Sequence, residues 1–393
     1  LTDVSAATGN LVVNAGRDAT VTDASAIEGD VTITAGRDAD GGITVTAAEG
    51  TVTVNAAGNI TLTNATAAET VVLDNTGAEA GDDIIITNAD SATSVTVTSV
   101  GAVTATAGNG LDEVTSLTVT AVEASAIDAD GTTDDQAITL NAADPDGDAV
   151  VFTLEASDVE TLALGGSSAI VVSVDSGDIS TETVTSTNTV SAMLDYTAAT
   201  AADLTNVAAN VVNNMGADFD NITLTVDSDT NIQLDTEVGQ TDTSGGGQMV
   251  IFDHETNAST STNNAFTLSV GDSNTANTTA DDTATVDGLN FVDIQALTIA
   301  LGEFNIDFDD DQDLVGADLE TVTITGTGDF DLNANTITGD ATNRVTLDAS
   351  ELEGVLTMVV DGTANGVASV TSGDGADRIT IDGITGETAG VAL

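Results

Sequence analysis

Short stretches of alternating apolar and polar residues recur along the N-terminal third at a near-constant interval. Each stretch, such as 31–34, places apolar side chains on one face and Thr on the other, as a half-buried strand does. Strands this short cannot bury a face alone, so a fixed period predicts a solenoid of stacked coils. The apolar positions that open successive stretches are Val31, Ile43, Val52, Ile60, Val71, Ile84 and Val95.

A longer repeat sets the expected size of one coil. The segment Ala15–Ala19 (AGRDA) recurs as Ala35–Ala39, 20 residues later. This interval spans two of the short strands, so we expect two strands per coil, paired in parallel from coil to coil. The alternative is a β-sandwich with regular turns, in which residues 52–63 would pair as an antiparallel hairpin.

Charge and composition limit the function. The chain has 65 acidic residues against four Arg, with no Lys, no Cys and one His, for a net charge of −61. Such a surface repels nucleic acid and anionic lipid, and thiolate zinc sites and thiol catalysis are excluded. No apolar run reaches the ~20 residues of a membrane span. We therefore expect a non-enzymatic extracellular protein without nucleic-acid or membrane-inserting partners, and, from the start at Leu1, a processed or partial product.

Aromatic residues and one apolar pattern divide the chain. All eight Phe lie from Phe152 onward, and the segment 128–150 is rich in Asp and Gly. Apolar residues between 204 and 215 recur at helical spacing and are followed by Gly216, which predicts a helix over 201–215. The expected fold is all-β: a β-solenoid over 1–135, a β-rich middle domain with one short helix over 136–286, and a second solenoid over 287–393.

Two glycine-rich stretches point to calcium. Residues 108–115 and 373–380 both follow the pattern G-x-G-x-D-x-U-x, which resembles the calcium-binding nonapeptide of RTX proteins. Ala107 and Ser372 stand where that repeat begins with Gly, and an ordinary turn is the alternative. The resemblance implies calcium at two sets of residues, namely Gly108, Gly110 and Asp112, and Gly373, Gly375 and Asp377.

Two further acidic segments are candidate calcium sites, because hard cations prefer carboxylate and carbonyl oxygens. Asp144, Asp146 and Asp148 lie in a segment that resembles the acidic turn of bacterial cadherin-like adhesin repeats. The run 307–313 holds five carboxylates that would repel one another without a cation, although a solvated loop is the alternative. Its candidate ligands are Asp307, Asp309, Asp311 and Asp313. His254, between two acids, is expected on the surface.

Family resemblances converge on the bacterial cell surface. Residues 11–75 are similar to the repeats of filamentous haemagglutinin-type β-helical adhesins. The phrases 158–164 (DVETLAL) and 318–324 (DLETVTI) resemble RTX-type surface-layer proteins. The resemblance implies a secreted, calcium-stabilised subunit that self-assembles into a surface lattice or sheath, with a cell-surface polysaccharide as a further partner. The alternatives are an adhesin segment that binds a host or neighbouring cell and, third, a polysaccharide-active β-helix.

Overall fold

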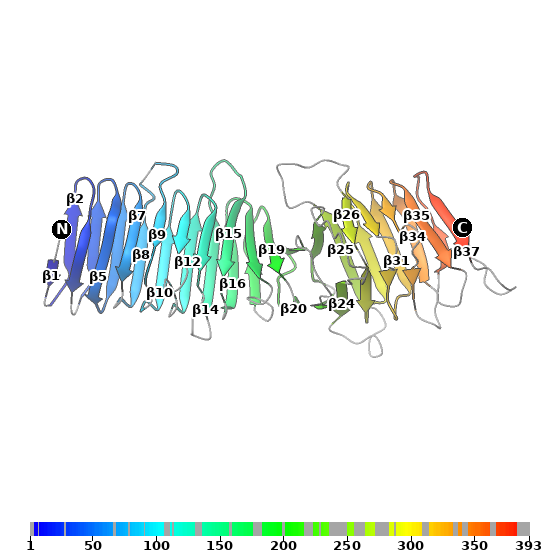
Figure 1. The fold of residues 1–393 in the computed structure, drawn as a ribbon, viewed down its shortest axis with the longest axis horizontal. Helices are drawn as coiled ribbons and strands as arrows, with labels where there is room; N and C mark the ends of the chain where they lie inside the picture. The colour runs from blue at the N-terminus through cyan, green and yellow to red at the C-terminus, as the bar shows by residue number, and fades with distance from the viewer. Residues whose placement is uncertain are drawn as a thin grey trace, which may run out of the picture. The chain divides into compact units, whose positions relative to one another are not determined.

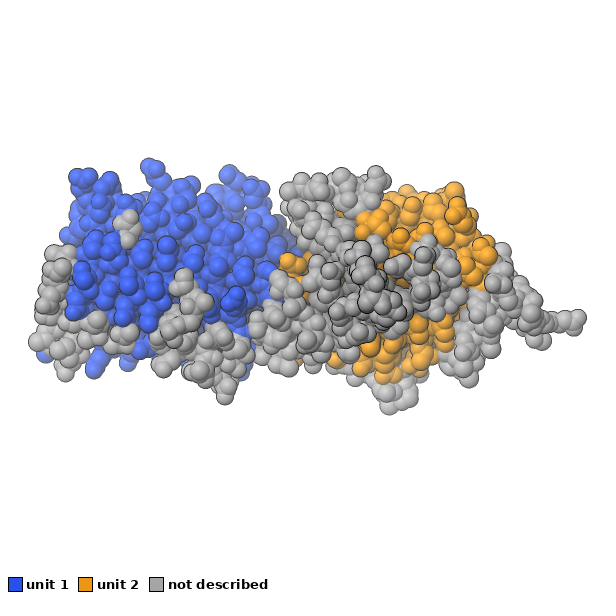
Figure 2. Space-filling view, viewed as in Figure 1, with its two compact units in different colours: residues 1–194 blue, residues 195–393 orange. Residues whose placement is uncertain are grey.

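The computed structural model is a β-solenoid, and every regular element in the residues that it describes is a β-strand (Figure 1). The coils fall into two compact units, residues 1–194 and 195–393 (Figure 2). The described residues are 4–6, 8–26, 29–65, 68–77, 79–89, 91–105, 111, 114–129, 136–156, 159–175, 183–198, 201–215, 223–227, 229–235, 250–254, 264–271, 283–286, 288–308, 314–332, 337–339, 345–361 and 367–382.

Unit 1 consists of two parallel sheets, and successive strands alternate between them. The odd-strand sheet contains β1 (Val4–Ala6), β3 (Val21–Ala26), β5 (Ala39–Ala48), β7 (Ile60–Ala65), β9 (Ile84–Ile86), β11 (Val103–Ala105), β13 (Ser125–Asp128), β15 (Val150–Glu155) and β17 (Ile170–Asp175). The even-strand sheet contains β2 (Leu11–Ala15), β4 (Val31–Ala35), β6 (Thr51–Ala56), β8 (Thr70–Asp74), β10 (Ser94–Thr98), β12 (Ser116–Ala121), β14 (Gln136–Ala142), β16 (Val159–Gly166) and β18 (Thr183–Ser186). The strand β19 (Ala192–Ala198) spans the division between the units.

The strand register confirms the predicted parallel stack. Ala15 pairs with Ala35, so the 20-residue repeat is one coil of two strands. Val52 pairs with Val31 on one side and with Val71 on the other, always in parallel. The strands β6 and β7 belong to different sheets, which excludes the antiparallel hairpin of a sandwich.

The apolar positions predicted from the alternation form the interior. All seven side chains that open the strands of the repeat are at most 1% exposed. Their Thr neighbours, such as Thr32 and Thr53, point to the opposite face and are half-buried. The two-residue period of a strand therefore sorts the side chains, and burial of the aliphatic half drives coil stacking at roughly 25 cal/mol per Å² of apolar surface.

Unit 2 contains three parallel sheets. The first contains β20 (Ala201–Asp203), β22 (Thr223–Val226), β24 (Val250–His254), β27 (Leu289–Val292), β30 (Leu314–Val315) and β33 (Ile337–Thr338). The second contains β21 (Val211–Met215), β23 (Ile232–Asp235), β25 (Ala265–Gly271), β28 (Ala296–Ala300), β31 (Thr321–Gly326), β34 (Val345–Leu352) and β36 (Val367–Thr371). The third contains β26 (Thr283–Val286), β29 (Asn305–Phe308), β32 (Phe330–Asp331), β35 (Leu356–Asp361) and β37 (Arg378–Asp382).

From β24 onward, three successive strands enter three different sheets, and phenyl rings fill the interior that they enclose. Phe252 pairs in register with Phe291, and their rings stack with centroids 5.2 Å apart. Phe266 comes from the second sheet and lies 5.3 Å from Phe252. In the third sheet, Phe308 and Phe330 have centroids 5.7 Å apart. All five rings are at most 2% exposed.

The helix predicted over 201–215 is wrong. The segment forms β20, a turn and β21, and Val207 and Val211 donate backbone bonds to the carbonyls of Leu204 and Ala208. Leu204, Val207, Val211 and Met215 are buried, as the apolar pattern required. The same spacing fits a turn followed by an alternating strand, and pairing of β21 with β23 favours the strand.

The acidic segment near 128–150 lies within one continuous stack. Across it, β12 pairs with β14 and β13 pairs with β15. The two compact units divide instead after Leu194. Asp144, Asp146, Gly147 and Asp148 belong to the turn that joins β14 to β15, which requires a positive φ of 86° at Gly147.

Candidate functional site

Carboxylates and amides at the corners of the unit 1 coils form ladders from one coil to the next. In one ladder, the backbone N–H of Asp30 donates to Asn10 Oδ1 at 3.2 Å, and the N–H of Thr51 donates to Asp30 Oδ1 at 2.9 Å. The Asn10 side-chain amide also donates to Asp30 Oδ2 at 3.1 Å. Each side chain therefore accepts a bond from a backbone N–H one coil further on, at a corner where the sheet pairing is interrupted.

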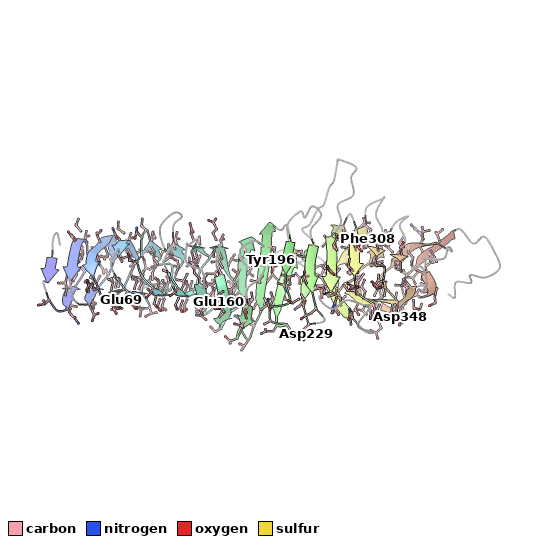
Figure 3. All side chains as sticks on the ribbon, turned by 90° about the horizontal axis from the view of Figure 1, so that it is seen from below. Glu69, Glu160, Tyr196, Asp229, Phe308 and Asp348 are labelled. Atoms are coloured by element: carbon pink, nitrogen blue, oxygen red, sulfur yellow. The ribbon has the colours of Figure 1, made fainter. Side chains whose placement is uncertain are left out.

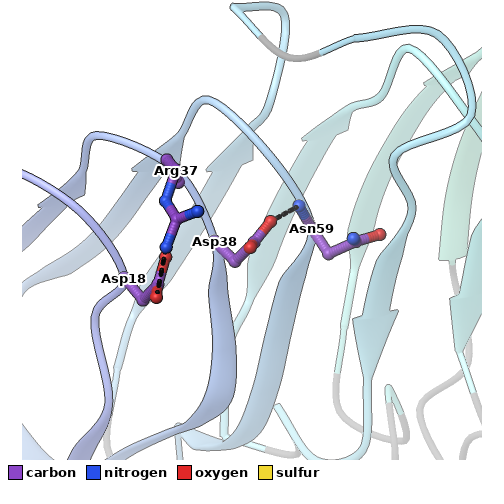
Figure 4. Close-up of polar contacts among 4 residues, drawn as sticks. All are labelled: Asp18, Arg37, Asp38 and Asn59. Atoms are coloured by element: carbon purple, nitrogen blue, oxygen red, sulfur yellow. Dashed lines mark hydrogen bonds and ion pairs between the residues drawn. The ribbon is translucent and has the colours of Figure 1, made fainter.

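A second ladder runs along another corner of unit 1. The backbone N–H of Asn59 donates to Asp38 Oδ1 at 3.2 Å, that of Asp83 donates to Asn59 Oδ1 at 2.7 Å, and that of Ala102 donates to Asp83 Oδ1 at 2.9 Å. Figure 4 shows the first of these bonds beside the ion pair between Arg37 and Asp18, whose atoms are 2.8 Å apart. Since both partners are about half exposed, the pair adds at most about 1 kcal/mol.

Unit 2 uses the same device. The backbone N–H of Asp329 donates to Asn305 Oδ1, and that of Val355 donates to Asp329 Oδ1, both at 2.7 Å. The backbone N–H of Leu356 donates to Asp377 Oδ1 at 3.0 Å. Bonds to an ionised acceptor are worth roughly 1.5–3 kcal/mol when buried and less at an exposed corner. These acids therefore hold coils together.

Of the two RTX-like stretches, the structure describes the second in full and the first only at residues 111, 114 and 115. Gly108, Gly110 and Asp112 lie outside the described residues. Gly373 and Gly375 lie between β36 and β37, where a Cβ atom would collide with the carbonyl oxygens of Leu352 and Gly354 in the preceding coil. Both glycines are thus needed for close coil packing, and Asp377 already accepts a backbone bond.

Asp144, Asp146 and Asp148 lie on the turn between β14 and β15. The backbone N–H of Asp146 donates to Asp144 Oδ1 at 2.7 Å, and the N–H of Asp144 donates to Ser168 Oγ at 3.1 Å. Asp144 is half-buried, whereas Asp146 and Asp148 are exposed. The first carboxylate therefore shapes the turn, and the other two face solvent.

The acidic run 307–313 is described only at its start. Asp307 is half-buried on β29 and pairs in register with Asp331 of the next coil. Asp309, Asp311 and Asp313 lie outside the described residues. Over the part of the chain that is described, no group of three or more His, Asp or Glu side chains is placed to hold a metal ion. Calcium binding at the candidate residues stays a prediction.

His254 is buried, contrary to the expected surface position. It is 6% exposed at the end of β24, which the surrounding acids in the sequence gave no reason to expect. Its neighbour Asp253 has a pKa above the usual range, because of partial burial and the nearby Asp293 carboxylate, with His254 acting in the opposite direction. Asp293 has a positive φ of 56°. Asp253 and His254 end β24, and Asp293 directly follows β27. The three residues therefore lie on two neighbouring coils, since β24 pairs with β27.

A hollow of about 200 Å³ lies over β11, β13 and β15. Apolar and Thr side chains line most of it, and the two carboxylates of the lining, Asp128 and Glu155, are register partners in neighbouring coils. Neither His nor Arg contributes to the lining. The lining residues are Thr104, Ala105, Ala126, Ile127, Asp128, Thr153 and Glu155.

No family model, curated protein or solved structure matches this chain. The described residues contain no helix that is long and apolar enough to span a membrane. The fold alone therefore defines the class of protein. The chain is a parallel β-solenoid with ladders of acidic and amide side chains at its corners. Such a fold is compatible with structural and adhesin-like surface proteins.

Proposed function

We propose that this chain is a structural, non-enzymatic subunit that assembles with copies of itself on the outside of a cell. One observation carries the proposal. The acidic and glycine residues that the sequence singled out, where the structure describes them, mostly serve coil stacking or turn formation. Asp144 shapes its turn, Asp377 accepts a backbone bond from a neighbouring coil, and Gly373 and Gly375 allow close approach of the coils.

The unit 1 ladders support the same function. Asn10, Asp30, Asp38, Asn59 and Asp83 each accept a bond from the next coil, so the polar side chains add to the sheet pairing. A stack of this kind is stabilised by contacts between neighbouring coils, and its length follows from the number of coils. This suits a protein whose task is to span and cover a surface.

Calcium is the proposed assembly switch. A net charge of −61 opposes association of copies, and monovalent salt only screens it over a Debye length of about 8 Å. Divalent ions held by exposed carboxylates such as Asp146 and Asp148 neutralise charge locally and bridge two copies. Attachment to a cell-surface polysaccharide is part of the same proposal.

Electron microscopy and sedimentation of the purified chain test the proposal. We expect ordered sheets or filaments in CaCl₂, their loss on adding chelator, and no recovery in NaCl of equal ionic strength. The paired variant Asp146→Asn with Asp148→Asn should raise the calcium concentration needed for assembly. The control Asp18→Asn removes a surface carboxylate that already pairs with Arg37, and it should leave that concentration unchanged. A chain that stays monomeric in every condition contradicts self-assembly, and binding of that monomer to cells would favour the adhesin alternative.

A further inference from the structure

The outer side of the even-strand sheet carries rows of uncharged side chains in register. Thr53 lies two rungs from Thr96, with Val72 between them, and Thr96 is followed directly by Thr118 and then Thr139. A parallel row contains Thr98 and Thr120 and also one carboxylate, Asp74. We call this surface, formed by the outward residues of β2 to β18, the neutral face. Its Thr side chains are half-buried among their neighbours in the rows.

The lack of charge on this face is unusual for the chain. Although 65 of 393 residues are acidic, the nine strands of this sheet, all described, contain only Asp74 and Glu160. Asp74 ends β8 and accepts a bond from the N–H of Thr76, and Glu160 lies at a β-bulge near the start of β16. Figure 3 shows Glu160 on the same side of the coils as Glu69, which precedes β8 of the same sheet. The acids are therefore kept off the centre of the face.

The other sheet of unit 1 differs. Its described outward positions include Asp23, Asp128 and Glu155, and the last two are adjacent in register. A copy that docked there would bring like charges together, which opposes association. On the neutral face no two carboxylates are register partners, so a second, equally acidic chain meets mostly hydroxyl and methyl groups there.

We propose that the neutral face is the surface through which two copies of this chain pack, an inference that rests on the proposed self-assembly. Nine strands about 4.8 Å apart and about five residues long at about 3.3 Å each give a flat area on the order of 600 Å² per copy. The total of about 1,200 Å² reaches the lower end of specific interfaces. Hydroxyl rows supply hydrogen bonds across such a contact without charge.

Charge introduced on the face tests the proposal. Thr96→Glu with Thr118→Glu adds two carboxylates at the centre of the neutral face, and Thr61→Glu with Thr153→Glu adds the same charge to the other sheet. We expect the first pair to raise the protein concentration needed for assembly at least tenfold, measured by sedimentation velocity in CaCl₂. The control pair should stay within about twofold of the parent chain. Equal assembly of both pairs would overturn the proposal while leaving self-assembly intact.

A second design does not depend on folding of the charged variants. Because the sequence has no Cys, Thr118→Cys and Thr153→Cys each give one labelling site in the folded chain. A polyethylene glycol maleimide at position 118 should block assembly, and the same label at 153 should not. Blocking at neither position assigns assembly to another surface. A parent chain that never assembles refutes the proposed function itself, and the docking face with it.

Discussion

Unit 1 closes each coil with two strands, whereas unit 2, from β24 onward, places three successive strands in three sheets. The interiors differ accordingly. Unit 1 is filled by Val, Ile, Leu and Ala, and its single Phe, Phe152, has the small Ser125 as one register neighbour. Unit 2 packs five phenyl rings where the third sheet widens the cross-section. The size of the interior side chains thus follows from the number of strands per coil.

The largest effect is expected where a charge enters the narrow interior of unit 1. Ile60→Asp removes a fully buried side chain and buries an unpaired carboxylate, at a cost of about 5 kcal/mol or more. The control Thr61→Asp is half-buried on the outer side and should change stability by less than about 1 kcal/mol. Chemical denaturation followed by circular dichroism measures both. Similar losses for the two variants would contradict the assigned interior.

A reciprocal exchange tests the two cross-sections directly. Phe291→Ala empties part of the unit 2 interior and should cost about 3–5 kcal/mol. Leu62→Phe forces a ring into the narrower interior of unit 1 and should cost about 1–3 kcal/mol. Denaturation midpoints give the two values. If Leu62→Phe were neutral, the claim that the interior of unit 1 is narrower than that of unit 2 would be wrong.

The corner ladders should contribute less, and similarly in both units. Asp30→Ala and Asp329→Ala each remove the acceptor for a backbone N–H of the next coil, at about 1–2 kcal/mol. Asp30→Asn and Asp329→Asn keep an acceptor oxygen and should retain most of the stability. Amide hydrogen exchange should speed up at Thr51 and Val355, respectively. If exchange were unchanged in either Ala variant, the ladder at that position would not stabilise the contact between its two coils.

The smallest effect concerns the titration of one carboxyl group in unit 2. The raised pKa of Asp253 means that its carboxylate form is disfavoured in the folded state, so stability falls as pH rises from the unfolded pKa of this group through its folded pKa. Asp253→Asn should therefore raise the melting temperature at pH 7, and the gain in the free energy of unfolding should be less than about 1 kcal/mol. The gain should shrink as pH falls through the folded pKa of Asp253 and vanish below its unfolded pKa. A gain that is the same at every pH would point to packing instead of charge.

The sequence predicted unit 1 well because its signals are local. The alternation at Val31–Ala35 determines which side chains enter the interior, and the repeat at Ala15 and Ala35 equals one coil. Unit 2 was harder to predict, since strands such as β30 and β33 have only two residues. The apolar spacing around Val211 fitted helix and strand alike, and only pairing with β23 distinguishes them.

The corner ladders could not be predicted from composition. Asn305 and Asp329 are 24 residues apart and meet only because one coil has that length. Without the register, an Asp in a glycine-rich turn suggests a calcium ligand as readily as a backbone acceptor. Asp377 is an example: it lies beside a glycine-rich turn, yet it accepts a bond from the backbone N–H of Leu356 in the preceding coil.

Distances between spin labels test the parallel stack most directly. The outer positions of Thr61 and Thr153 are separated by four rungs, through Ile85, Thr104 and Ala126, and Ser173 follows one rung later. With rungs about 4.8 Å apart, Cys pairs at 61 and 153 and at 61 and 173 should be about 19 and 24 Å apart, respectively, before allowance for the labels. Pulsed electron resonance should show the second distance longer by one rung. Equal distances, or a shorter second one, would contradict the solenoid.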